Sequence, residues 1–201
     1  MKSNNRGMSL IELVVVIAIM TILIGAGGYG VVMLSGAEAR QAAKMMEAQL
    51  NDIKTGSMSR AAEYMYLYYV DSSDLNADKG VDSVGFYVDK RISTIANTST
   101  IMANLGDPEY SRIGSGKVKI TAFYDSGSTY DLSMGTGNAL LLEFDRKSGT
   151  LLPMRMGSAA GIDPSFYGSG TTGTLEKMTF ECGVKTYTIT FDTEVGTYSL
   201  E

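Results

Sequence analysis

The feature that most constrains this chain is a long uncharged segment near its N-terminus. The 22 residues from Leu13 to Leu34 carry no charged side chain and are mostly aliphatic. As an α-helix, such a segment is about 33 Å long, which is enough to cross a hydrocarbon layer of about 30 Å. Lys2 and Arg6 precede it, and a positive flank favours a cytoplasmic N-terminus with the rest of the chain outside. The segment therefore predicts one membrane-spanning helix.

The start of this segment differs from an ordinary secretory signal. Such signals have an apolar core of about 7–15 residues, followed by a cleavage site of small residues. Here the apolar run is longer, and its boundary glycine, Gly7, comes before the run. Glu12 also places a carboxylate near the start of the run, where transfer into lipid is costly. Glu12 either reaches the headgroup zone or has a partner inside the apolar layer.

The residues from Gly7 to Leu13 read Gly-Met-Ser-Leu-Ile-Glu-Leu and lead directly into the aliphatic run. This pattern strongly resembles the prepilin signature of type IV pilins and of the pseudopilins of type II secretion and DNA-uptake machines. The resemblance covers about residues 6 to 34. It implies that a membrane aspartyl peptidase cleaves between Gly7 and Met8 and methylates the new amine of Met8. One departure is Met8 itself, where the family most often has phenylalanine.

The resemblance also implies a role for Glu12 in assembly. Cleavage removes Lys2 and Arg6 and creates a cationic amine on Met8. An amine and a carboxylate in hydrocarbon each lose hydration, and pairing offsets much of that cost. In the family, the pair forms between subunits, so Glu12 sets the register of stacking. The implied partners are further copies of this chain, other pilin subunits, the prepilin peptidase, the membrane and the pilus assembly machinery.

The sequence divides into four regions. Residues 1–7 are the leader, 8–34 the transmembrane and filament-core helix, 35–70 an amphipathic helix of the head, and 71–201 a globular head. The precursor is expected in the cytoplasmic membrane with its head outside, and the mature protein in an extracellular or cell-surface filament. Glycines crowd positions 25 to 30. They either let neighbouring helices approach closely or mark a segment that unwinds in the filament.

The fold predicted for the outer part is α+β, a long helix laid across an antiparallel sheet. Six apolar residues follow helical spacing and predict an amphipathic helix. A stop or kink is expected at Thr55–Ser57. A further helix, which contains four tyrosines, is expected at Ser59–Val70. Strands are expected at 117–124, 139–144, 150–154, 174–182, 185–191 and 197–200, and 157–173 is expected to be a loop. Residues 84–105 have an ambiguous pattern, which suggests a strand at Val84–Val88 and a short helix that includes Ile92, Ile95, Met102 and Leu105. The six apolar helix residues are Ala39, Ala42, Ala43, Met46, Leu50 and Ile53.

The composition excludes several kinds of chemistry. The chain has no histidine and one cysteine, Cys182, so it can build neither a histidine-based triad or zinc site nor an internal disulfide. A net charge of −5 argues against nucleic-acid binding through phosphate neutralisation. No residues stand in a recognised catalytic spacing, so we predict no enzyme, no catalytic residue and no cofactor. The alternative is a membrane-anchored extracellular enzyme or binding module with an uncleaved anchor.

One acidic segment has part of the spacing of a calcium loop. Asp74, Asn76 and Asp78 stand two residues apart, as the first ligands of an EF-hand do. The sixth position, however, is Lys79 instead of glycine, and the twelfth is Gly85 instead of glutamate. The segment is therefore interpreted as a solvated turn, and no metal is predicted.

Overall fold

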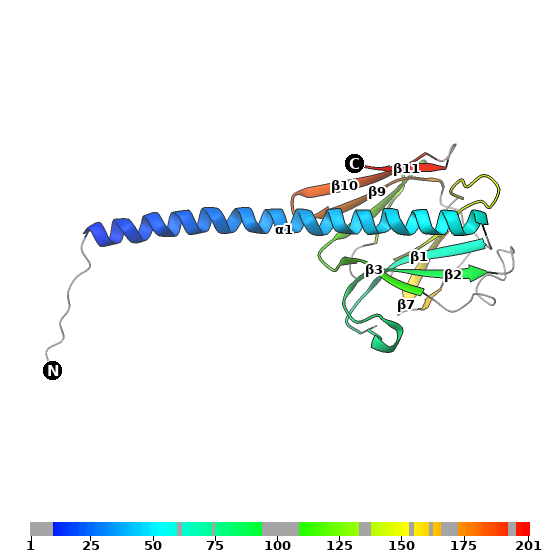
Figure 1. Ribbon diagram of the computed structural model, residues 1–201, viewed down its shortest axis with the longest axis horizontal. Helices are drawn as coiled ribbons and strands as arrows, with labels where there is room; N and C mark the ends of the chain where they lie inside the picture. The colour runs from blue at the N-terminus through cyan, green and yellow to red at the C-terminus, as the bar shows by residue number, and fades with distance from the viewer. Residues whose placement is uncertain are drawn as a thin grey trace.

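The computed structural model describes residues 10–59, 62–73, 75–93, 109–132, 138–152, 155–160, 163–165, 173–192 and 196–201. Its dominant element is α1 (Leu10–Ser59), a single 50-residue helix. At 1.5 Å per residue, a helix of this length extends about 75 Å. The N-terminal half projects from the molecule, and the C-terminal half lies along the head (Figure 1). Within the part of the chain that the structure describes, no helix combines the length and apolar character needed to cross a membrane.

The head consists of two antiparallel sheets. The first has the order β3-β2-β1-β6-β7-β8, and the second has the order β11-β10-β9-β4-β5. The strands of the first sheet are β1 (Ala62–Val70), β2 (Gly85–Ser93), β3 (Glu109–Ser115), β6 (Asn138–Glu143), β7 (Arg155–Ala160) and β8 (Asp163–Ser165). The strands of the second are β4 (Lys119–Tyr124), β5 (Thr129–Asp131), β9 (Leu175–Cys182), β10 (Lys185–Asp192) and β11 (Thr197–Leu200). A short 3-10 helix, Ala77–Lys79, lies between β1 and β2.

The main core lies where α1 meets both sheets. Strands β9–β11 lie on one side of the helix and β1–β3 on the other (Figure 1). All six apolar helix residues that the sequence pattern selected are fully buried, together with side chains from both sheets. The helix therefore packs against both sheets and joins them through one shared core. Its buried residues are Ala39, Ala42, Ala43, Met46, Leu50 and Ile53.

Close approach of the helix to the sheets depends on small residues. Gly114 of β3 faces Ala42 of α1, and a Cβ at Gly114 would lie 3.2 Å from the Cβ of Ala42. Polar contacts then flank the apolar seam. Ser115 Oγ donates to Glu38 Oε2 at 2.6 Å, and Lys54 Nζ donates to the carbonyl oxygen of Gly196 at 2.5 Å.

The first sheet also has a second, smaller core on its other face. Tyr66 and Tyr68 of β1 contact Tyr87 of β2 there, along with Val81 and Leu141. Met65 and Leu67 of the same strand point to the main core. The strand is therefore buried on both faces.

This double burial explains one wrong prediction. Ser59–Val70 was expected to be helical, but α1 ends at Ser59 and residues 62–70 form β1. A strand with apolar side chains on both faces has no clean alternation, so its pattern resembles a buried helix. Its tyrosines and Val70 nevertheless have high strand propensity. The stop or kink expected at Thr55–Ser57 is also absent, because the helix runs through these residues.

Two further predictions need correction. The segment 157–173 was expected to be a loop, yet β7 reaches Ala160 and pairs with both β6 and β8. Its small residues fit a strand near a sheet edge. Strand β2 extends to Ser93 and so includes Ile92, which was assigned to a possible short helix. Ile95, Met102 and Leu105 lie outside the described residues.

The strands predicted at 117–124, 139–144, 174–182, 185–191 and 197–200 are confirmed, with ends that differ by about one or two residues, although the strands form two sheets instead of one. The strand predicted at 150–154 is not: among the described residues of that range, only Leu151 pairs, in an isolated bridge with Phe144. Strand β9 pairs with β10 through Cys182 and Lys185, and β11 pairs with β10 at the edge of the second sheet. The turn after β6 closes through a hydrogen bond from Asp145 N to the carbonyl oxygen of Thr150, 2.8 Å long. The α+β class, with a long helix on antiparallel strands, is confirmed.

Candidate assembly surface

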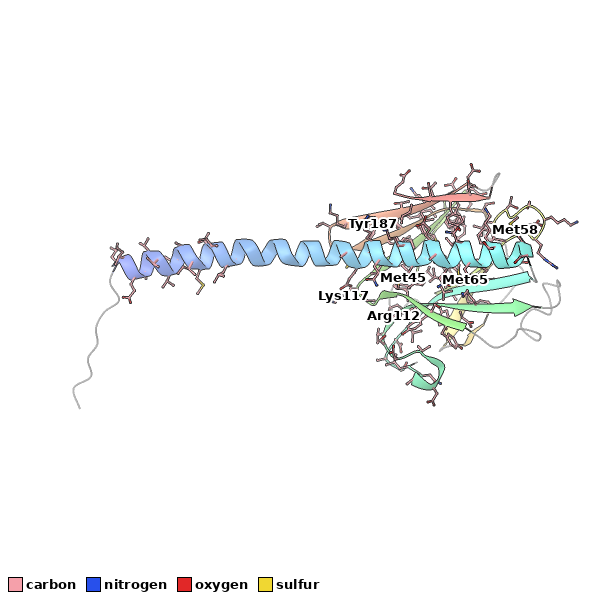
Figure 2. The ribbon with its side chains drawn as sticks, viewed as in Figure 1. Met45, Met58, Met65, Arg112, Lys117 and Tyr187 are labelled. Atoms are coloured by element: carbon pink, nitrogen blue, oxygen red, sulfur yellow. The ribbon has the colours of Figure 1, made fainter. Side chains whose placement is uncertain are left out.

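The projecting half of α1 carries a band of exposed apolar side chains. Twelve large hydrophobic residues between Leu10 and Ile24 are exposed, and Leu10 retains 83% of its accessible surface. Soluble monomers rarely expose continuous apolar surface on this scale, and larger patches mark interaction surfaces. The band surrounds the helix instead of forming one stripe, as expected for a helix covered on all sides. In Figure 2 its side chains stand away from the ribbon with no other element near them.

Glu12 lies within this band. It belongs to the first turn of α1 and is exposed in the single chain. A carboxylate in the first turn interacts favourably with the positive end of the helix dipole. Gly7 and Met8, the residues of the predicted cleavage site, lie outside the described residues. Of the predicted processing and assembly residues, the structure therefore places only Glu12.

Comparison with protein-family models identifies what this N-terminal segment is. Residues 2–28 match the model described as the prokaryotic N-terminal methylation motif. The chain carries a prepilin-type signature. This is the signature of type IV pilins and pseudopilins. Comparison of the whole chain with curated proteins and with solved structures gave no match.

The prepilin motif spans both the apolar band and Glu12. It matches a stretch that begins at Lys2 and ends at Gly28, so it includes Gly7, Met8 and Glu12. The motif implies processing by a prepilin peptidase and assembly with other pilins. It points to a structural, pilin-like precursor that is anchored in a membrane and ends in a surface filament.

The glycine-rich part of the motif is helical in the single chain. Helix α1 continues through residues 25 to 30 without a break. A Cβ at Gly25 would have no neighbouring atom within 4 Å, so nothing in the chain itself requires a glycine there. A glycine inside a helix costs about 1 kcal/mol relative to alanine. Both explanations, close approach of another helix and unwinding on assembly, remain predictions.

The described residues of the acidic segment form a tight turn. Asn76 N donates to Val81 O at 2.8 Å and Val81 N donates to Asn76 O at 2.9 Å, so the backbone closes a tight turn around the 3-10 helix. Gly80 has a φ of 76° in that turn, and Asp78 is exposed. Asp74 lies outside the described residues. Among the described residues, no three histidine, cysteine, aspartate or glutamate residues lie together as metal ligands.

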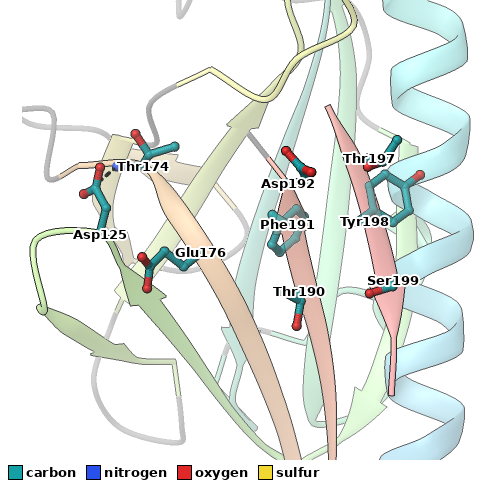
Figure 3. Close-up of a pocket in the computed structure, with 9 residues that line it drawn as sticks. All are labelled: Asp125, Thr174, Glu176, Thr190, Phe191, Asp192, Thr197, Tyr198 and Ser199. Carbon is teal, nitrogen blue, oxygen red and sulfur yellow. Dashed lines mark hydrogen bonds between the residues drawn. The ribbon is translucent and has the colours of Figure 1, made fainter. Parts of the chain in front are cut away.

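The structure also contains a cavity that the sequence did not indicate. It is open, has a volume of about 570 Å³, and lies at one end of the second sheet (Figure 3). Asp125 is fixed at its margin, because Thr174 N donates to Asp125 Oδ1 at 3.1 Å. The lining comes from four separate segments, so no local sequence pattern could reveal it. Its lining residues are Asp125, Thr174, Glu176, Thr190, Phe191, Asp192, Thr197, Tyr198 and Ser199.

Proposed function

We propose that this protein is a structural subunit of a type IV pilus or pseudopilus. The proposal has the leader cleaved after Gly7, Met8 methylated, and the mature chain polymerised through the projecting half of α1. The observation that supports it best is the coincidence of the methylation motif with the exposed apolar band. In a filament, the bands of neighbouring chains cover one another, which removes the apolar surface from water.

Glu12 and the Met8 amine form the specific contact in this proposal. Apolar surfaces attract without direction, so they do not by themselves fix how far one helix slides along another. A carboxylate held at one height on the rod does fix this, because an unpaired charge among apolar helices is costly. Glu12 of an incoming chain therefore pairs with the amine of a chain that is already assembled. Open-ended growth follows, since the two partners of this contact lie on different parts of each subunit.

The cleavage step is tested by mass spectrometry of the N-terminus, using protein from the membrane and filament fractions of producing cells. We expect the mature chain to begin at methylated Met8. An intact leader, residues 1–7, in assembled material would contradict the proposal and favour an uncleaved anchor.

The pairing step is tested with Glu12→Gln. This substitution keeps the size of the side chain and removes its charge, so the amine of the neighbouring chain is left without its counter-ion. Breaking a buried pair costs about 3–5 kcal/mol, which corresponds to a loss of more than about a hundredfold in the association constant. We expect normal cleavage but few filaments in sheared fractions and in electron micrographs. Glu47→Gln, on the head half of the same helix, is the matched control and should assemble normally.

A further inference from the structure

The head has a distinct edge at the point where the projecting half of α1 leaves it. Two turns meet the helix there. A Cβ at Gly36 would lie 2.9 Å from Lys185 Cγ, which places the β9–β10 turn directly against the helix. The β3–β4 turn lies beside the next residues, since Lys117 Nζ is 3.9 Å from Glu38 Oε1. We call this edge, formed by Gly36, Lys117 and the turn 183–185, the collar.

The collar exposes one apolar tip and two ammonium groups. Val184 is 75% exposed at the tip of the β9–β10 turn, although it is a branched apolar residue. Lys185 is exposed beside it, and the side chain of Lys117 is 78% exposed. Figure 2 places Lys117 at the end of the head that faces the projecting helix. Basic residues around an exposed apolar residue are typical of surfaces that rest at a lipid interface.

The acidic residues near the collar reduce its positive charge but do not remove it. Glu38 accepts a hydrogen bond from Ser115 Oγ, and its other oxygen pairs with Lys117 Nζ at 3.9 Å, a long and exposed contact that water and salt screen. Glu181 lies on β9 opposite Thr186 and Lys119, so it belongs to the sheet and not to the turn. Arg40 adds a further exposed positive charge on α1.

The position of the collar along α1 fits the thickness of a headgroup layer. The uncharged segment ends at Leu34, so Gly36 follows about 3 Å later and Glu38 about 6 Å later. A bilayer of about 40–45 Å with a hydrocarbon core of about 30 Å has a headgroup layer of about 5–7 Å on each side. When the uncharged segment spans the core, the collar lies in this layer.

We propose that the collar of the unassembled precursor binds anionic lipid headgroups. Lys117 and Lys185 face the phosphates, and Val184 enters the boundary between headgroups and acyl chains. This inference rests on the proposed function, which places the N-terminal half of α1 in a membrane. It adds a second contact, which holds the head at a fixed height above the bilayer before the chain joins a filament. Each lysine near an anionic surface contributes about a fivefold factor to such binding.

The test uses the full-length chain, which contains no tryptophan. Val184→Trp therefore introduces a single indole at the collar. Met58→Trp is the matched control, because Met58 is 51% exposed and lies at the far end of the head (Figure 2). Both variants are reconstituted into phosphatidylcholine vesicles with and without phosphatidylglycerol, and flotation measures membrane association.

The indole at the collar reports whether this edge enters the headgroup layer. In the Val184→Trp variant, we expect the emission to shift to shorter wavelength and to be quenched by lipids brominated near the headgroup. Both effects should be stronger with phosphatidylglycerol. The Met58→Trp variant should show neither effect.

Charge variants in the Val184→Trp background test the two lysines. Quenching measures the ratio of chains with the collar in the headgroup layer to chains with the collar in water. Lys117→Gln and Lys185→Gln should each lower this ratio about fivefold. Glutamine keeps the Cγ with which Lys185 contacts Gly36. Lys147→Gln, in the exposed turn near Met58, should have no effect.

The outcomes separate the two proposals. A chain that does not float with the vesicles contradicts the membrane anchoring of the proposed function. The collar inference alone is overturned if the chain floats while the collar indole behaves like the control indole, or ignores phosphatidylglycerol and the lysine variants. A signal from the collar indole that depends on the ratio of protein to lipid would assign the collar to a second copy of the chain and would also overturn the inference.

Discussion

At the scale of single residues, one hydroxyl joins the last strand to the helix. Tyr198 of β11 donates a hydrogen bond to Asn51 Oδ1 of α1, 2.6 Å long. Burial, with a smaller contribution from the carboxylate of Glu47, raises the pKa of Tyr198 to about 12. The tyrosine therefore stays protonated when it is folded at a pH where an unfolded tyrosine, with a pKa of about 10, would ionise.

This pKa gives a prediction for stability at high pH. Because the folded pKa is the higher one, the contribution of Tyr198 to stability is complete below about pH 10 and is lost between about pH 10 and 12. Tyr198→Phe should lower the free energy of unfolding by about 0.5–1.5 kcal/mol at neutral pH and should weaken its fall over this window. Urea denaturation of the full-length chain in mild detergent measures both effects. Tyr187→Phe, on the adjacent strand, is the matched control; an unchanged pH dependence in Tyr198→Phe would contradict the assignment.

Residue-level predictions from the sequence succeeded where one face of an element is clearly apolar. A single cysteine within an alternating strand pattern is typical of a small buried residue, and Cys182 is 6% exposed in β9. Burial raises the pKa of its thiol, so the residue is suited to packing more than to reactivity. In the strand predicted at 117–124, alternation puts Val118, Ile120, Ala122 and Tyr124 on one face, and all four are buried. Glu12 was identified from its position in the sequence, five residues after Gly7. Such a local motif can be recognised without knowledge of the fold.

At the scale of elements, α1 combines two environments in one helix. Two adjacent methionines show the change of environment from one side of the helix to the other. Met46 is fully buried in the main core, whereas Met45 is 41% exposed and lines an open groove together with Arg112.

These neighbours form a matched pair for a stability test. Met46→Ala removes buried atoms and leaves a cavity, so it should lower the free energy of unfolding by about 2–5 kcal/mol. Met45→Ala makes the same chemical change at the surface and should alter stability by no more than about 0.5 kcal/mol. Chemical denaturation followed by circular dichroism compares the two. Equal losses would show that the helix does not present the face described here.

Secondary-structure predictions were wrong where a strand lacked the alternation of apolar and polar residues, or where the strand was short. Strand β1 is apolar on both faces, and β7 and β8 are short strands with many small or polar residues, which resemble a loop sequence. The division into two sheets was also beyond a local pattern, since β1–β6 and β4–β9 join segments that are far apart in the sequence. The collar and the open cavity are assembled in the same way, from segments that only the fold brings together.

At the scale of the whole molecule, both sheets share one core with α1. The main core contains residues of the helix, of β1, β2 and β6 from the first sheet, and of β4, β9 and β10 from the second. Neither sheet can leave the helix without exposing side chains of the other, so we predict that the head unfolds in a single transition. Urea transitions followed by far-ultraviolet circular dichroism and by tyrosine fluorescence should coincide. Two separate midpoints would show that the sheets unfold independently.

The unbroken course of α1 has a geometric consequence for any filament built on its N-terminal half. Each residue of an α-helix turns the chain by about 100° and advances it by about 1.5 Å. The number of residues between Glu12 and Gly36 therefore sets the angle of the head around the helix axis, as well as its distance along that axis. Deleting one residue from this interval would rotate the head by more than a quarter of a circle relative to Glu12. Deleting seven residues would nearly restore the original angle, to within about 20°, and would bring the head about 10 Å closer to Glu12 along the helix axis.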